Sequence, residues 1–377
     1  MEPFKNFISP ALVRSMGEHL VRASRAFNRR AFEQRALHGL EALELKARAH
    51  QVCDALELGL PQDFAKACKL LVDSLAPPGE GDDLSVLRTG QAGLAGWAVW
   101  PMSEYVARHG MDDVPLALKT LHEMTQRFSA EWAIRPFILR HPDVTYPTLL
   151  RWTRDPSAHV RRLVSEGSRP RLPWGMVLKP LIADPSPTLP LLRALQDDPS
   201  EYVRRSVANH LNDIAKDHPE RVVQWLAQYL PDAPPERKAL LRHASRTLIK
   251  QGHQGVLHAW GIGTPLRGKA SLTLAPAHAR LGGALQLEVM LRSTQRRGTQ
   301  ALVIDYAVHH VKANGSTSPK VFKGWRCELA PGETRQLSKR HSLKQVTTRR
   351  YHAGEHRIEL LVNGKPVAEA AFDLALR

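Results

Sequence analysis

Two short segments of the sequence place a glutamate close to a tryptophan and an arginine. The first, SAEWAIRPF at residues 129–137, contains Glu131, and the second, SEGSRPRLPW at residues 165–174, contains Glu166 and ends on Trp174. A pair of carboxylates beside a large aromatic ring can hold a cationic planar ligand, because the ring face attracts positive charge and the carboxylates neutralise it. Glu131, Glu166 and the tryptophans beside them are therefore candidates for a site that holds such a ligand.

Arginines accompany these carboxylates. Residues 135–171 contain eight of them, and a helix over this segment places Arg162, Glu166 and Arg169 on one stripe at i, i+4 and i+7. In the next helical unit the corresponding stripe is Arg205, Asn209 and either Asn212 or Asp213. Stripes of this kind on adjacent helices predict a basic concave wall that contains carboxylates.

Each candidate also has a simpler interpretation. Glu131 could pair only with Arg135 at i+4, and Glu166 only with Arg162 on the same helix, as solvated ion pairs do. Trp174 could be core packing at a helix start that proline interrupts. The sequence leaves these alternatives open.

No cofactor or metal site is expected. The chain has no GxxxxGK[ST] phosphate loop, no GxGxxG after a strand, and no histidine or cysteine spacing typical of a metal site. The three cysteines are far apart, which fits reduced thiols. No secretory signal and no apolar stretch long enough to span a membrane is visible, so we expect a monomeric, cytoplasmic and nucleoid-associated bacterial protein without membrane contact.

The charge of the chain predicts a polyanionic partner. The 377 residues carry a net charge of +16, and residues 265–377, with 19 Lys+Arg against 8 Asp+Glu, carry +11 of it. Basic runs at 339–344 and 348–352 suggest a second contact with DNA, or alternatively a sheet edge that is charged against aggregation. The DNA-binding candidates of the whole chain are Arg162, Arg169, Arg171, Arg205, Asn209, Lys339, Arg340, Arg349 and Arg350.

Residues 1–262 form the first predicted domain, which is helical. Apolar positions recur with a helical period over residues 8–75, which indicates about three helices, and the motif D-P-S-x-x-V-R-R occurs at Asp155 and again 43 residues later at Asp198. We expect the aspartate of each motif to cap the following helix. Helix pairs at this spacing are typical of HEAT repeats, which stack into a solenoid.

Residues 265–377 form the second predicted domain. Its apolar residues alternate with period two in several short runs, and Asn-Gly and Pro-Gly pairs separate them as turn signals. Six to eight short strands of this kind predict an immunoglobulin-like β-sandwich. The fold class is therefore a HEAT-like α-helical solenoid followed by a basic β-sandwich.

The two glutamate segments resemble those of AlkC, the C branch of the HEAT-like DNA alkylation repair glycosylases. The resemblance spans about residues 1–260, and some members carry an added immunoglobulin-like domain, which residues 265–377 fit. It implies a DNA glycosylase that removes cationic N3-alkylated bases such as 3-methyladenine from double-stranded DNA without flipping them out. It also implicates Glu131, Glu166 and Trp174 as the active-site group. The alternative is a non-enzymatic HEAT-repeat scaffold that binds nucleic acid or an acidic protein.

Overall fold

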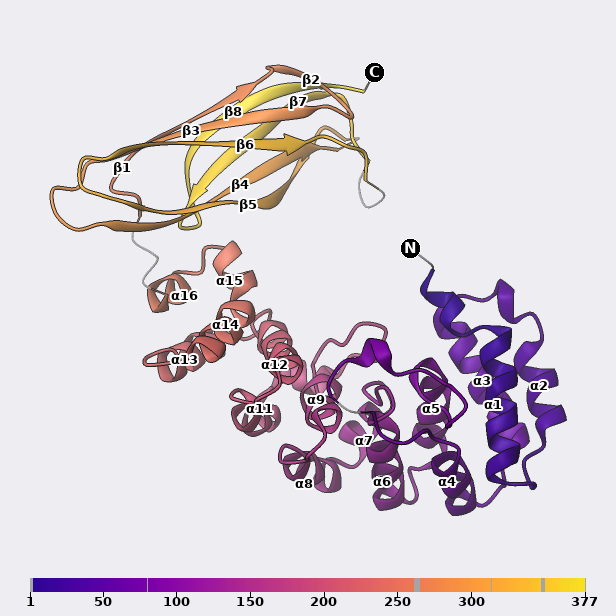
Figure 1. Ribbon diagram of the computed structural model, residues 1–377. Helices are drawn as coiled ribbons and strands as arrows, with labels where there is room; N and C mark the ends of the chain where they lie inside the picture. Colours follow the sequence, from indigo (N-terminus) through magenta and orange to yellow (C-terminus); the bar gives the residue numbers. More distant parts are fainter. Residues whose placement is uncertain (1–2, 80, 261–264, 313, 347–349, 377) are drawn as a thin grey trace. The chain divides into compact units, whose positions relative to one another are not determined.

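Helices follow one another along the first 260 residues of the computed structural model, and strands make up the rest (Figure 1). The structure describes residues 3–79, 81–260, 265–312, 314–346 and 350–376. The α-helices are α1 (Pro10–Ala23), α2 (Arg29–Leu37), α3 (Leu45–Gly59), α4 (Phe64–Asp73), α5 (Val99–His109), α6 (Val114–Thr125), α7 (Arg135–Arg140), α8 (Pro142–Trp152), α9 (Ala158–Gly167), α10 (Lys179–Ala183), α11 (Leu189–Leu195), α12 (Glu201–Ile214), α13 (Pro219–Tyr229), α14 (Pro235–Ala244), α15 (Arg246–Lys250) and α16 (Gln254–Ala259).

The chain forms two units. The first comprises Met1–Asp217 and Ala233–Ala244, and the second comprises His218–Asp232 and Ser245–Arg377. Helices α13, α15 and α16 thus belong with the strands, although the sequence alone assigns them to the helical domain. The functional boundary at residues 262 and 265 stays a prediction.

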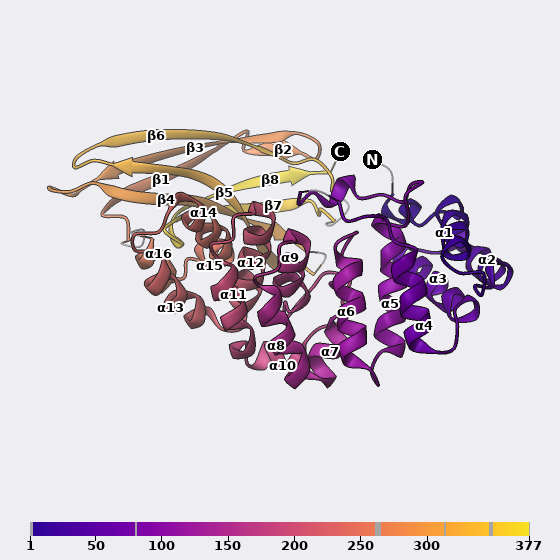
Figure 2. The ribbon, with the colours of Figure 1, turned by 60° about the horizontal axis from the view of Figure 1, so that its bottom comes forward.

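Helices α1 to α12 of the first unit succeed one another in roughly chain order, as stacked helical repeats do (Figure 2). The region 8–75 holds four α-helices, one more than the sequence indicates. On α9 the residues Val160, Leu163 and Val164 are fully buried, as the helical periodicity predicts. This arrangement confirms the helical solenoid.

The D-P-S motifs start helices in a different way from the one predicted. Helix α9 begins after Ser157 and α12 after Ser200, so serine and not aspartate occupies the N-cap position, and the Ser200 hydroxyl accepts a hydrogen bond from the backbone N–H of Val203. Each aspartate instead accepts a hydrogen bond from the backbone N–H of the serine two residues later, at 2.8 Å for Asp155 and 2.9 Å for Asp198. A turn of this type suits aspartate and orients the chain for the helix that follows.

The first arginine of the first V-R-R sequence, Arg161, joins two neighbouring repeats. Arg161 donates two hydrogen bonds to the carboxylate of Asp198, at 2.6 and 3.0 Å, and also donates to the carbonyl of Asp155 in its own motif. A bidentate pair between arginine and carboxylate fixes both distance and orientation. The motif therefore sets the stacking of α9 against α12, and it leaves the second arginine, Arg162, for another role.

The second unit contains a sandwich of two sheets, which confirms the predicted fold class. Strands β1, β3 and β6 form one sheet, and the other has the order β2-β8-β7-β4-β5. Leu287, Val289 and Leu291 of β3 and Ile304 and Val308 of β4 are buried between them. The strands are β1 (Gly268–Ala275), β2 (His278–Arg280), β3 (Ala284–Ser293), β4 (Gln300–Val311), β5 (Thr317–Leu329), β6 (Thr334–Ser342), β7 (Gly354–Val362) and β8 (Lys365–Ala375).

Two glycines bring the short helices of the second unit against the sandwich. Gly252 lies between α15 and α16 with φ +73°, and a Cβ built there would come within 2.6 Å of the Cα of Gly364 in the β7–β8 turn. Gly364 also has a positive φ, +77°. Only glycine adopts this conformation at little cost and also allows so close an approach of two backbones.

The described residues contain no helix that is long and apolar enough to cross a membrane. Within the same residues, no group of three or more His, Cys, Asp or Glu side chains is arranged to hold a metal ion.

Candidate active site

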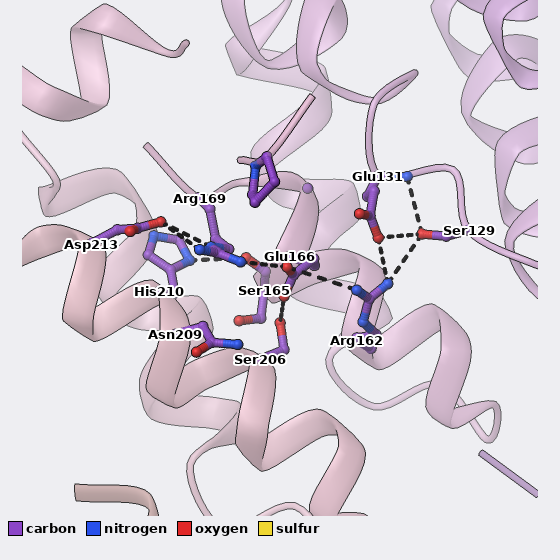
Figure 3. A network of polar contacts seen from close by, with 12 residues as sticks. Ser129, Glu131, Arg162, Ser165, Glu166, Arg169, Ser206, Asn209, His210 and Asp213 are labelled. Atoms are coloured by element: carbon purple, nitrogen blue, oxygen red, sulfur yellow. Dashed lines mark hydrogen bonds and ion pairs between the residues drawn. The ribbon is translucent and has the colours of Figure 1, made fainter. Parts of the chain in front are cut away.

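Glu131 lies in the turn before α7, and its carboxylate faces α9. Its Oε2 accepts a hydrogen bond from the Ser129 hydroxyl at 2.7 Å and a short charge-assisted bond from the guanidinium of Arg162 (Figure 3). Arg162 also donates to Ser129 at 3.1 Å. Only 10% of the Glu131 side chain is exposed. The carboxylate is thus held by a serine from its own turn and an arginine from the next repeat.

Glu166 occupies the last turn of α9 and is held from both sides. Its Oε1 accepts from Arg169 at 2.5 Å and lies 3.7 Å from the second nitrogen of Arg162. Its Oε2 accepts from the Ser206 hydroxyl of α12 at 2.5 Å. The Glu166 side chain is 7% exposed. Arg162 therefore lies between the two glutamates and binds both.

The two arginines keep Glu166 ionised. Burial by itself raises the pKa of this carboxyl, but the charges of Arg162 and Arg169 and the hydrogen bond from Ser206 outweigh it, so its pKa lies below the ordinary value. Asp213 of α12 completes the row, because its carboxylate accepts from Arg169 at 2.9 Å and from Lys216 at 2.8 Å. Negative and positive side chains thus alternate along this wall.

Of the four carboxylate oxygens of Glu131 and Glu166, Oε1 of Glu131 is available for a further hydrogen bond. Both oxygens of Glu166 have partners, whereas every hydrogen bond to the Glu131 carboxylate within the described chain goes to Oε2. Oε1 of Glu131 can accept a hydrogen bond from a water or approach a positive centre without breaking an existing contact. The geometry gives the two glutamates different chemical possibilities.

Trp174 belongs to an aromatic cluster beside this wall. Its ring stacks on Trp100 with the centroids 6.3 Å apart, lies 6.5 Å from Trp132, and meets Phe4 of the 3-10 helix η1 (Phe4–Phe7) edge-on at 6.1 Å. Trp174 is 52% exposed, whereas Trp100 is buried. One side of the indole therefore rests on the cluster while much of it faces outward.

Arg135 anchors the loop that carries Trp174. This fully buried guanidinium donates to the carbonyls of Gly167, Arg169 and Met176, each at 2.8 Å. Burial, reinforced by the charge of Arg169, lowers the pKa of Arg135 to about 10, so the group remains charged at neutral pH. Trp174 itself has φ +61°, a conformation that costs on the order of 1–3 kcal/mol for a residue with a side chain. A strained, exposed tryptophan on an anchored loop is typical of a functional site.

The simpler interpretations of the three candidates do not describe this site. Glu131 pairs with Arg162 across two elements and not with Arg135. The pair of Arg162 and Glu166 exists, but it is nearly buried and belongs to a larger network. Trp174 is not core packing. The structure brings Glu131 and Glu166 together through Arg162, and it places Trp174 in the neighbouring aromatic cluster.

Comparison with known proteins decides the family. Residues 269–376 match the family described as the C-terminal Ig-like domain of the uncharacterised protein YhaZ. Over 367 residues the chain is 33% identical to the uncharacterized protein YhaZ of Bacillus subtilis (strain 168), with 97% of each chain covered. The Pseudomonas fluorescens alkylpurine DNA glycosylase AlkC, solved bound to DNA containing an abasic site analog, is 34% identical, with 99% of this chain and 100% of that chain covered and a TM-score of 0.88. This chain belongs to the AlkC family.

Family membership confirms the resemblance seen in the sequence, including the immunoglobulin-like domain at the C-terminus.

The DNA-binding residues predicted for the helical unit of this AlkC chain fall into two groups, those that pair with carboxylates and those that do not. Arg162 and Arg169 hold carboxylates, and Arg171 pairs with Asp217. Arg205 is exposed on α12 without an ion pair or ring contact in the described residues, and Asn209 accepts from His243 at 2.9 Å. Arg205 is thus the member of the set most open to a phosphate.

In the sandwich, Arg340 on β6 and Arg350 are exposed, as a DNA contact requires. Lys339 has a structural contact instead, because its ammonium group donates to the carbonyls of Lys323 and Gly324 on β5 at 2.8 and 3.3 Å and thereby links the two sheets. Arg349 lies outside the described residues. The contact with DNA stays a prediction for all four.

Sequence reasoning missed Ser129 and Ser206, whereas Asp213 was one of two alternatives for the stripe of the second repeat. The repeat register gave no signal for Ser206, because its counterpart 43 residues earlier is the core residue Leu163. Ser129 stands two residues before Glu131, a spacing that allows a hydroxyl to reach the carboxylate, and this signal could have been used.

Proposed function

We propose that this chain is a DNA glycosylase that excises cationic N3-alkylated bases of the 3-methyladenine type from double-stranded DNA. The observation that carries the proposal is the pair of nearly buried carboxylates that Arg162 joins, in a wall where carboxylates and basic side chains alternate. The related AlkC, an alkylpurine DNA glycosylase bound to DNA containing an abasic site analog, supports both the activity and the partner.

The proposed substrate explains why carboxylates can catalyse excision without a strong general acid. An N3-alkylated adenine is already cationic, so its glycosidic bond is weakened without protonation and no strong general acid is needed. As the bond stretches, positive charge moves to the sugar, and fixed negative groups in a poorly solvated site stabilise that state. Glu166, ionised and held by three partners, supplies such a fixed charge.

Glu131 has the second task. Its Oε1 can orient a water, or take a proton from it, as the water attacks C1′ of the sugar. Trp174 provides an exposed face for stacking on the sugar or the base. The active groups lie on a wall of side chains, which suits a base that stays in the helix. The catalytic domain is then 1–262, and 265–377 adds a second contact with DNA.

A scaffold that only binds nucleic acid explains the carboxylates less well. Arginine raises the affinity for phosphate, whereas glutamate lowers it, because like charges repel. A scaffold needs neither a nearly buried carboxylate pair nor a strained tryptophan. Monomeric state and location in the cell stay predictions.

The substrate prediction is tested with duplexes that each carry one lesion. A cationic base such as 3-methyladenine should be excised, whereas uracil and 8-oxoguanine should remain, because the proposed catalytic groups stabilise positive charge and do not protonate a leaving base. Excision is measured by release of the base at enzyme excess. Release of uracil at a comparable rate contradicts the proposal.

A second prediction concerns the sandwich. The double variant Arg340→Ala, Arg350→Ala should bind DNA more weakly and flatten the dependence of log K on log salt by about 0.9 for each phosphate that the protein no longer neutralises. Fluorescence anisotropy at several salt concentrations measures this slope. The control is Arg357→Ala on β7, which removes a positive charge already paired with Glu369 at 2.8 Å. An unchanged slope in the double variant means that these arginines form a solvated sheet edge and do not touch DNA.

A further inference from the structure

Tyr202 packs against the arginine that joins the two glutamates. It lies in the first turn of α12, and the Cζ atom of Arg162 stands 5.1 Å from the centroid of its ring. The edge of the same ring meets His159 of α9, with the centroids 5.6 Å apart. Tyr202 occupies in the second D-P-S motif the position that His159 has in the first. The ring thus lies between α9 and α12 and contacts the arginine that joins the two glutamates.

The guanidinium of Arg162 must be fixed to serve both carboxylates. It donates hydrogen bonds to Glu131 and Ser129 and lies 3.7 Å from Glu166, so a small rotation would break its contact with one of the two glutamates. An aromatic face attracts a guanidinium, and the attraction is stronger where water is excluded. Burial raises the pKa of the Tyr202 phenol, despite the opposing charge of Arg162, so the ring stays neutral and adds no third anion.

The next repeat offers a comparison within the same chain. Arg205 has the position in its motif that Arg162 has in the previous one, yet it is exposed and has no ring contact or ion pair in the described residues. The two arginines differ in their surroundings, and the ring of Tyr202 is one part of that difference.

We propose that Tyr202 is a positioning residue, whose ring holds Arg162 in the place where it binds Glu131 and Glu166 at once. The kinetic consequence rests on the proposed glycosylase activity. The structural consequence does not, because a displaced guanidinium changes the titration of the glutamates whether or not the protein excises a base.

The test compares Tyr202→Leu with Tyr202→Phe in the full chain. Leucine removes the ring and should slow single-turnover excision by about 10- to 30-fold, while phenylalanine keeps the ring and should stay within about threefold of the wild type. DNA affinity should change less than about twofold in both, because Tyr202 offers no charge to phosphate. Tyr146→Leu on α8 is the matched control for the loss of a partly buried tyrosine, and its excision rate should equal that of the wild type.

A second readout needs no activity. In protein labelled with 13C at the glutamate carboxyls, Tyr202→Leu should raise the titration midpoint of Glu166, because the support from Arg162 weakens. Tyr202→Phe should restore the wild-type midpoint. The other charged or titratable groups around Glu166 are unchanged in all variants: Glu131, Arg135, Arg169, His210 and Asp213.

The outcomes separate the two proposals. If the wild type releases no base, the glycosylase proposal fails, and the carboxyl titration still decides the role of Tyr202. If Tyr202→Leu leaves the midpoint of Glu166 unchanged, or if Tyr202→Phe shifts it as far as leucine does, the ring does not position Arg162. A loss of excision in Tyr146→Leu equal to that in Tyr202→Leu also overturns the proposal.

Discussion

Glu166→Gln and Glu131→Gln are each expected to lose base excision, on the order of 10²- to 10³-fold, while DNA binding is retained. Glutamine keeps the size of the side chain, but at position 166 it removes the charge that stabilises the sugar cation, and at position 131 it removes the carboxylate that orients or deprotonates the water. Neither glutamate attracts phosphate, so its neutralisation does not weaken DNA affinity. Single-turnover excision of a 3-methyladenine duplex measures the first effect, and anisotropy measures the second.

The control for both variants is Glu201→Gln, an exposed glutamate at the start of α12. It removes the same charge from the same unit and should excise at the wild-type rate. Normal excision by both Glu131→Gln and Glu166→Gln would show that the carboxylate pair is not the catalytic group.

Arg162→Gln should have the largest effect on stability. It leaves Glu131 and Glu166 nearly buried without the cation that joins them, and breaking a buried ion pair from one side costs about 3–5 kcal/mol in the free energy of unfolding. Excision should be lost as well, since at least one carboxylate then gains a proton or moves. Chemical denaturation at neutral pH measures the change, with Arg205→Gln, an exposed arginine of the same motif position, as the control.

The effect of Arg162→Gln should depend on pH. The pKa of Glu166 is lowered on folding, so its ionised form contributes stability above the ordinary glutamate pKa of 4.5, and this contribution is lost as the pH falls through the lower pKa of the folded state. The difference between wild type and variant should therefore shrink below about pH 4.5. A difference of less than about 1 kcal/mol at neutral pH, typical of an exposed pair, contradicts the role assigned to Arg162.

Much of the site could be predicted because it follows from helix geometry. Residues four apart on a helix lie on one face, so the contact of Arg162 with Glu166 was visible in the sequence. The bond from Arg162 to Glu131 was not, because it depends on how α9 packs against the turn before α7. Ser206 was missed for the same reason, since it reaches Glu166 only when α12 stacks on α9.

The strands, like the site residues, could be predicted only in part. Strands β1, β3, β4, β6 and β7 coincide with the alternating runs of the sequence, whereas the three-residue strand β2 and the longer strands β5 and β8 were not recognised. β5 contains Pro319 and Gly324, and β8 begins with Lys365 and Pro366, so the alternating pattern is interrupted in both. Pairing with β4 and β7 keeps these segments extended. The aspartate caps were wrong because a turn and a cap both suit aspartate, and the serine that follows was closer to the helix start.

Mass spectrometry of the bases released from methylated duplex DNA tests the central claim most directly. The wild-type chain should release 3-methyladenine well above the spontaneous rate, and Glu166→Gln should not. Release of no alkylated base by the wild type, with DNA binding intact, would contradict the glycosylase and favour a nucleic-acid-binding scaffold.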